Sequence, residues 1–101
     1  MSEKRNLDPQ FKPRVDAYIA LANQHCNSAQ VGEVRASLLF AAARFNAFTV
    51  ASMAPNAQVL KAGTQHAVDF FTDEFRKMLE DNLRDQTENF AAYFTPTKGN
   101  A

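Results

Sequence analysis

The residues best suited to carry chemistry in this chain are two histidines, one cysteine and a set of carboxylates. Carboxylate-bridged metal sites in helical bundles place a Glu three residues before a His, so that both side chains point at one metal ion. Neither histidine has this spacing, because Ala22 stands three residues before His25 and Gly63 stands three before His66. Side chains at adjacent positions such as His25 and Cys26 point about 100° apart on a helix, which suits one metal ion poorly. The sequence therefore predicts no metal site and no cofactor.

Nucleophilic catalysis has equally little support. Cys26 continues the helical spacing of Tyr18 and Ala22 on one apolar face, so we expect a small buried hydrophobe rather than a reactive thiol. The three glycines are too scattered to form a phosphate-binding loop. No catalytic residue is predicted, and the sequence leans against an enzyme without deciding the question.

Arg44 is the one charged residue in the apolar run ASLLFAAARFNAFTVASMA, residues 36–54, and Asn46 follows it closely. A buried guanidinium is costly unless a carboxylate, a backbone carbonyl or a bound anion meets it. The long side chain can instead reach water while its stem packs. We therefore take Arg44, Asn46 and Tyr18 as a candidate polar site, with three states open for the guanidinium: solvated, paired with an acidic residue, or bound to an anion. The acidic candidates are Asp73, Glu80 and Asp81.

Composition narrows the class of protein. The chain has 101 residues, of which 46% are hydrophobic and 22% charged, as expected for one globular domain. Eleven basic and eleven acidic residues balance, so the broad positive field that drives nucleic-acid binding is missing. The single cysteine and a start without a signal-type apolar segment favour the cytoplasm. The run 36–54 has about the length of a membrane span, but Arg44 and its alanine-rich composition favour a core helix and no membrane association.

The periodicity of apolar residues predicts an all-α fold: a bundle of three long helices with a short extra helical turn between the second and the last. Residues 1–10 are expected to form a flexible arm, residues 11–94 a single helical domain, and residues 95–101 a flexible tail. The individual elements are placed at residues 11–26, at a central helix that has Gly32 just inside its start and ends before Pro55, at residues 57–62, and at residues 64–93. Asp8, Asn56 and Thr64 are the expected N-caps, although Pro13 leaves the start of the first helix open.

Aromatic residues exceed what one small core can hold. Phe70 lies beside Phe71 and must face elsewhere, while Phe90, Tyr93 and Phe94 gather at the end of the last helix. Exposed aromatic side chains of this kind usually mark a protein interface, and homodimerisation is its commonest use. Phe70, Phe90, Tyr93 and Phe94 are therefore the candidate interface.

Three blocks of sequence carry a resemblance: DAYIALANQ near the start, ASLLFAAARFNAF in the centre and VDFFTDEFRKMLEDNLRDQTENF in the last helix. In this order they resemble a family of small, uncharacterised, mostly proteobacterial proteins, over most of the chain from about residue 11 to residue 90. The resemblance implies a compact, all-helical bacterial protein of the cytoplasm, without recognised catalytic residues.

Two functions remain open from the sequence. The first is a non-enzymatic helical interaction module that forms a homodimer through its final helix. The alternative is a bundle that binds a small molecule or an anion near Arg44. A protein partner other than a second copy is not predicted.

Overall fold

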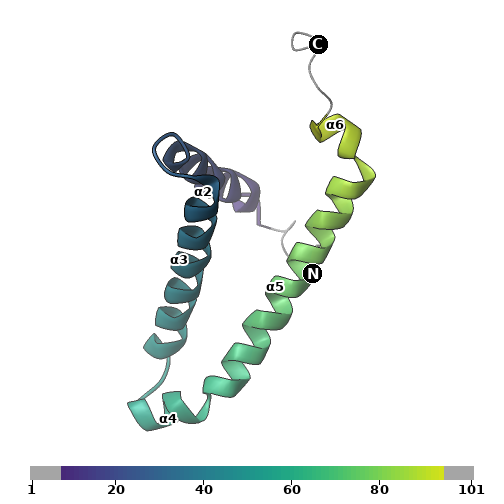
Figure 1. Cartoon of the computed structure of the whole chain (residues 1–101). Helices are drawn as coiled ribbons and strands as arrows, with labels where there is room; N and C mark the ends of the chain where they lie inside the picture. Colours follow the sequence, from purple (N-terminus) through teal and green to yellow (C-terminus); the bar gives the residue numbers. More distant parts are fainter. Residues whose placement is uncertain (1–7, 95–101) are drawn as a thin grey trace. The chain divides into compact units, whose positions relative to one another are not determined.

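The computed structural model describes residues 8–94, all of whose regular elements are α-helices (Figure 1). The all-α class is thus confirmed for this part of the chain, with three long helices and the expected short one. A second short helix, α6, was not predicted. The predicted tail and most of the predicted arm lie outside the described residues. The helices are α2 (Phe11–His25), α3 (Val31–Ser52), α4 (Ala57–Ala62), α5 (Thr64–Glu88) and α6 (Phe90–Phe94).

The chain divides into two compact units, Met1–Ala51 and Ser52–Ala101, and each is described by itself. The first contains α2 and nearly all of α3. The second contains α4, α5 and α6. The prediction of a single domain over residues 11–94 stays a prediction.

Helix α2 begins two residues before Pro13, and the predicted cap is wrong, because Gln10 and not Asp8 is its N-cap. The amide of Gln10 donates to the Asp8 carboxylate, and the first bond closing a helical turn runs from the amide of Arg14 to the carbonyl of Gln10 at 3.1 Å. Pro13 therefore occupies the third helical position, where a backbone donor has no partner to lose. The helix ends at His25, one residue earlier than predicted, and Cys26 is its C-cap.

Helix α3 is fixed at its start by Glu33. The Glu33 carboxylate accepts the amide of Gln30 at 3.0 Å, while the amide of Glu33 donates to the Gln30 carbonyl at 2.9 Å. This arrangement resembles half of a capping box and satisfies an amide that the helix cannot. The helix ends at Ser52, before Pro55, as the proline predicted.

Helix α4 has the predicted bounds, and Asn56 is confirmed as its cap, since its side chain accepts the amide of Val59 at 2.9 Å. The predicted cap of α5 is wrong. Gly63 precedes the helix, and the Thr64 hydroxyl donates backwards to the Leu60 carbonyl at 3.2 Å. The amide of Gly63 still bonds to α4 while its carbonyl accepts the amide of Ala67, so the backbone passes from one helix to the next without needing a side-chain cap.

The prediction of an unbroken last helix to Tyr93 is also wrong. Asn89 ends α5 with a backbone of φ −117° and ψ 27°, and α6 follows at Phe90. The Asn89 side chain donates to both the carbonyl and the carboxylate of Asp85. These local bonds compete with continued helix, as asparagine side chains commonly do.

Within the first unit taken by itself, the central helix α3 is not buried as the sequence led us to expect. Among the described residues only Val34 is buried, with 8% of its surface exposed, whereas Phe40, Phe45 and Phe48 are 65% to 68% exposed. Within the described part of its own unit, α2 is the only other helix, and it lies near the start of α3 (Figure 1). Within residues 8–94, no helix combines the length and apolarity needed to cross a membrane.

Candidate functional site

A groove of about 390 Å³ lies between α2 and α3, and we call it the α2–α3 groove. Its lining is mostly apolar, with three bulky side chains and three alanines. Alanines allow another helix or a ligand to approach the backbone closely. These apolar lining residues are Leu21, Val34, Leu38, Ala22, Ala29 and Ala41.

Polar groups at the groove come from both helices. Tyr18 and His25 belong to α2, while Glu33 and Ser37 belong to α3. The Ser37 hydroxyl already donates to the Glu33 carbonyl at 2.9 Å, so it is satisfied within its own helix. An apolar occupant whose edges are polar fits this lining best.

The structure brings only one member of the predicted polar site to the groove. Tyr18 lines it, but Arg44 and Asn46 are not among the lining residues. Arg44 is exposed and Asn46 is half-buried, with its carbonyl accepting the Thr49 hydroxyl at 2.8 Å. The role of these three residues stays a prediction.

Two of the acidic residues considered as partners of Arg44 are engaged within α5. Asp73 forms ion pairs with Arg76 at 3.2 Å and Lys77 at 3.1 Å. Asp81 pairs with Arg84 at 3.0 Å. All of these side chains are roughly half exposed, so the pairs add little stability and mainly form a solvated face.

The expected burial of Cys26 is wrong, because the thiol is exposed. Helix α2 ends at His25, so Cys26 is the C-cap and does not continue the apolar face of the helix. Over residues 8–94, no three His, Cys, Asp or Glu side chains are grouped so as to hold a metal ion.

The predicted interface residues all lie at the surface of the second unit, 53% to 62% exposed. Phe90, Tyr93 and Phe94 form a C-terminal aromatic cluster, with ring centroids of Phe90 and Phe94 4.8 Å apart and those of Tyr93 and Phe94 6.2 Å apart. Phe70 instead stacks edge-to-face on Phe71 at 5.1 Å. The structure thus brings three of the four residues together and leaves Phe70 with another partner.

A polar network fixes this cluster to α5. The Tyr93 hydroxyl donates to the Asp85 carboxylate at 2.6 Å, and the Asn89 amide donates to the same carboxylate at 2.9 Å. The hydrogen bond to Asp85 and its negative charge raise the pKa of Tyr93. Sequence reasoning missed Asp85 and Asn89, although the spacing of four between Asp85, Asn89 and Tyr93 was a readable signal.

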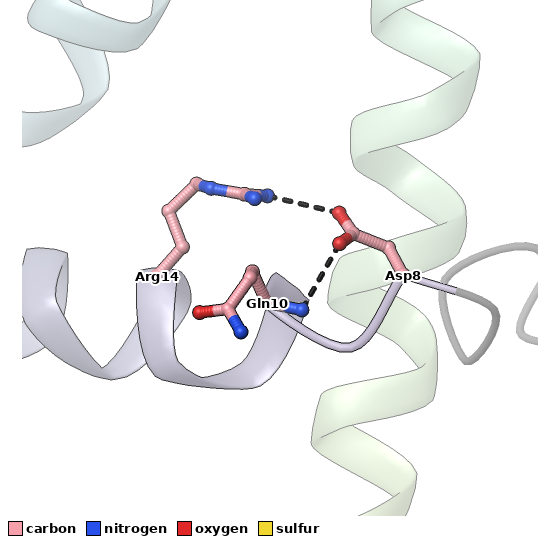
Figure 2. A network of polar contacts seen from close by, with 3 residues as sticks. All are labelled: Asp8, Gln10 and Arg14. Atoms are coloured by element: carbon pink, nitrogen blue, oxygen red, sulfur yellow. Dashed lines mark hydrogen bonds and ion pairs between the residues drawn. The ribbon is translucent and has the colours of Figure 1, made fainter.

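Asp8 forms a second polar network at the start of α2 (Figure 2). Its carboxylate accepts the Gln10 amide at 3.0 Å and the Arg14 guanidinium at 3.1 Å. The hydrogen bond from Arg14, followed by that from Gln10, lowers the pKa of Asp8. The network stabilises the first turn of the helix and is too exposed to be a binding site.

A band of apolar side chains runs along one side of α5 at helical spacing, and we call it the α5 stripe. The members other than Phe71 are 39% to 55% exposed, while Phe71 is half-buried. The charged residues of α5 lie mostly on its other faces. The α5 stripe consists of Val68, Phe71, Phe75, Met78, Leu79 and Leu83.

Comparison with solved structures finds the protein NB7890A from Shewanella sp., determined by NMR. Its sequence is 33% identical to this chain, the match covers 90% of this chain and 97% of that one, and the TM-score is 0.73. No curated protein matches the chain. Residues 11–87 match the family described as "Protein of unknown function (DUF3144)", and the resemblance drawn from the three sequence blocks is thereby confirmed. The chain therefore belongs to the DUF3144 family of proteins of unknown function.

Proposed function

We propose that this protein is a non-enzymatic helical interaction module of the cytoplasm that forms a homodimer through its final helix. The observation that carries the proposal is the extent of uncovered apolar surface. Taken by itself, the first unit leaves large apolar side chains of α2 and α3 exposed, and the second unit leaves those of α5 and α6 exposed. Soluble monomers rarely expose continuous apolar patches larger than a few hundred Å².

The final helix is the strongest part of this surface. Its aromatic residues are held in place, because Asp85 and Asn89 fix the C-terminal aromatic cluster to the end of α5. Aromatic side chains that are already ordered lose little further freedom when a partner binds. Aromatic residues are also enriched at the centres of protein interfaces.

Ligand binding near Arg44 is the second candidate. The exposed guanidinium and the α2–α3 groove, whose volume falls in the usual range for small-molecule sites, favour it. We rank it below dimerisation, because Arg44 does not line this groove and Glu33 does, which disfavours an anion there.

Light scattering coupled to size exclusion tests the dimer. We expect a mass near twice the chain mass of 11.3 kDa at micromolar concentration. The double variant Phe90→Ser/Phe94→Ser should weaken association at least tenfold, because it removes the C-terminal aromatic cluster. Lys77→Ser is the control, since Lys77 is exposed on the charged side of α5 and belongs to none of the apolar surfaces. A wild-type protein that stays monomeric at this concentration would contradict the proposal.

A further inference from the structure

We infer that Asp85 is the latch of a hinge at Asn89, and that α5 and α6 exchange between two arrangements. In the latched arrangement, which the structure shows, the Tyr93 hydroxyl bonds to Asp85 and α6 turns away from the axis of α5 (Figure 1). In the released arrangement that bond is broken and one continuous helix runs to Phe94. The inference concerns α5 and α6 alone, within the second unit, and does not depend on the proposed homodimer.

The hydrogen bond between Tyr93 and Asp85 requires the bend. The two residues are eight positions apart, which in a continuous helix separates them by about 12 Å along the axis. Side chains stand out sideways from a helix and lean toward its N-terminus, so the Asp85 carboxylate would point away from Tyr93. The observed distance of 2.6 Å therefore depends on the break between them. The hydrogen bond and the bend form and disappear together.

The backbone hydrogen bonds show what the chain gives up at the bend. The helical ladder stops at the amide of Asn89 and starts again at its carbonyl, which accepts the amides of Ala92 and Tyr93 at 3.0 and 3.1 Å. In a continuous helix the amides of Phe90 and Ala91 would each donate to the carbonyl four residues before. Within residues 8–94 the bent backbone forms neither of these two bonds. Straightening the helix would add both.

The two arrangements are therefore close in free energy. A hydrogen bond to a carboxylate is roughly twice as strong as one between neutral groups. The single bond from Tyr93 to Asp85 thus offsets about two backbone bonds, the number that straightening adds. From Thr64 to Phe94 the chain also has no glycine or proline, the residues that most strongly break a helix. A small change in either set of bonds is enough to select between the arrangements.

Straightening redirects the C-terminal aromatic cluster. Phe90 and Phe94 lie seven and eleven residues after Leu83. On one continuous helix, these separations place both side chains within about 20° of the direction of Leu83. The released helix therefore extends the α5 stripe by two aromatic side chains, whereas the latched α6 carries them off the axis of α5 (Figure 1). The hinge decides whether these aromatic residues join the stripe or form a separate cluster.

Nuclear magnetic resonance of the full chain tests the hinge with the variant Tyr93→Phe. This change removes the hydroxyl, and with it the latch, while it keeps the aromatic ring. We expect exchange of the amide hydrogens of Phe90 and Ala91 with solvent to slow at least tenfold, because both become helical donors. The Cα chemical shift of Asn89 should move to a helical value. Asp85→Ala removes the acceptor instead of the donor and should slow the same two amides.

The matched control is Tyr18→Phe. It removes the same hydroxyl from the chain's other tyrosine, which lies on α2 in the first unit. It should leave the exchange rates of Phe90 and Ala91 unchanged. An equal slowing in this variant would contradict the assignment of the latch.

Three further results would overturn the inference. If the amides of Phe90 and Ala91 exchange as fast in Tyr93→Phe as in the wild type, the bend does not depend on the latch. If α6 loses its helical chemical shifts in that variant, the bond only keeps α6 folded and does not select between two helical arrangements. Wild-type amides already as protected as those in the middle of α5 would mean that the helix is not bent. A monomeric wild type, by contrast, would refute the proposed homodimer and leave the hinge standing.

Discussion

At the scale of single residues, Asp85 is the most informative side chain in the described part of the protein. It accepts hydrogen bonds from Asn89 and from the Tyr93 hydroxyl, and so it links the last turn of α5 to α6. The carboxylate makes loss of the Tyr93 proton less favourable, because a phenolate would face a like charge and lose the bond. The pKa of Tyr93 therefore measures whether this hydrogen bond is formed.

Tyr93 should titrate above the ordinary tyrosine pKa of 10.0 in the folded protein. The chain has two tyrosines, so a Tyr18→Phe background isolates the signal in an ultraviolet titration. In that background Asp85→Asn should lower the pKa of Tyr93 toward 10.0. Because the pKa is raised on folding, the bond stabilises the protein fully below the ordinary pKa and ceases to do so as pH rises through the folded pKa.

The matched control for this titration is Asp81→Asn. It removes the same charge from the same helix, but Asp81 pairs with Arg84 and not with Tyr93. It should leave the pKa of Tyr93 where it was. Equal shifts in the Asp81 and Asp85 variants would show that the general charge of α5, and not the hydrogen bond, raises the pKa.

At the scale of elements, local side-chain chemistry sets where helices begin and end, and this decides which boundaries the sequence could predict. Pro55 and Asn56 act on their immediate neighbours, so the end of α3 and the whole of α4 were predicted correctly. The break at Asn89 was missed, because it depends on Asn89 and Tyr93 both reaching Asp85. The cap of α5 was misjudged, because the backbone of Gly63 continues from α4.

Asn56→Ala should destabilise the protein by about 1 kcal/mol, the usual effect of removing an N-cap. The amide of Val59 loses the side-chain oxygen that it now reaches at 2.9 Å. Urea denaturation followed by circular dichroism measures the loss. Asn23→Ala is the control, since Asn23 is exposed within α2, where alanine is the better helix former.

An Asn23→Ala variant as destabilised as Asn56→Ala would count against capping as the cause. The conservative change Asn56→Asp should retain most of the stability, because aspartate caps helices as well as asparagine does.

At the scale of the whole molecule, the sequence predicted which faces are apolar but not what covers them. The all-α class and the three long helices follow from the spacing of apolar residues, which is a property of each helix's own sequence. Burial of Phe40, Phe45 and Phe48 does not follow, because it depends on a second surface. For the same reason the groove was not foreseen: α2 and α3 must come together before Tyr18 and Leu38 can line one space.

If a second copy covers the apolar faces, stability must depend on protein concentration. We expect the melting temperature to rise by roughly 5 °C or more over about a hundredfold increase in concentration, because the dimer is favoured by mass action. Differential scanning calorimetry and circular dichroism together span that range. A melting temperature that is independent of concentration would mean that each chain folds alone.

Val34 lies beside the Glu33 cap and at the wall of the groove, where α3 is best covered in the first unit. Farther along α3, from Phe40 onward, the first unit leaves the large aromatic side chains exposed. Helix α3 should therefore open unevenly, fraying inward from Ser52 while the turns around Val34 stay closed. Amide hydrogens near Val34 should exchange with solvent last within this unit, which makes the start of α3 the part of the unit that opens last.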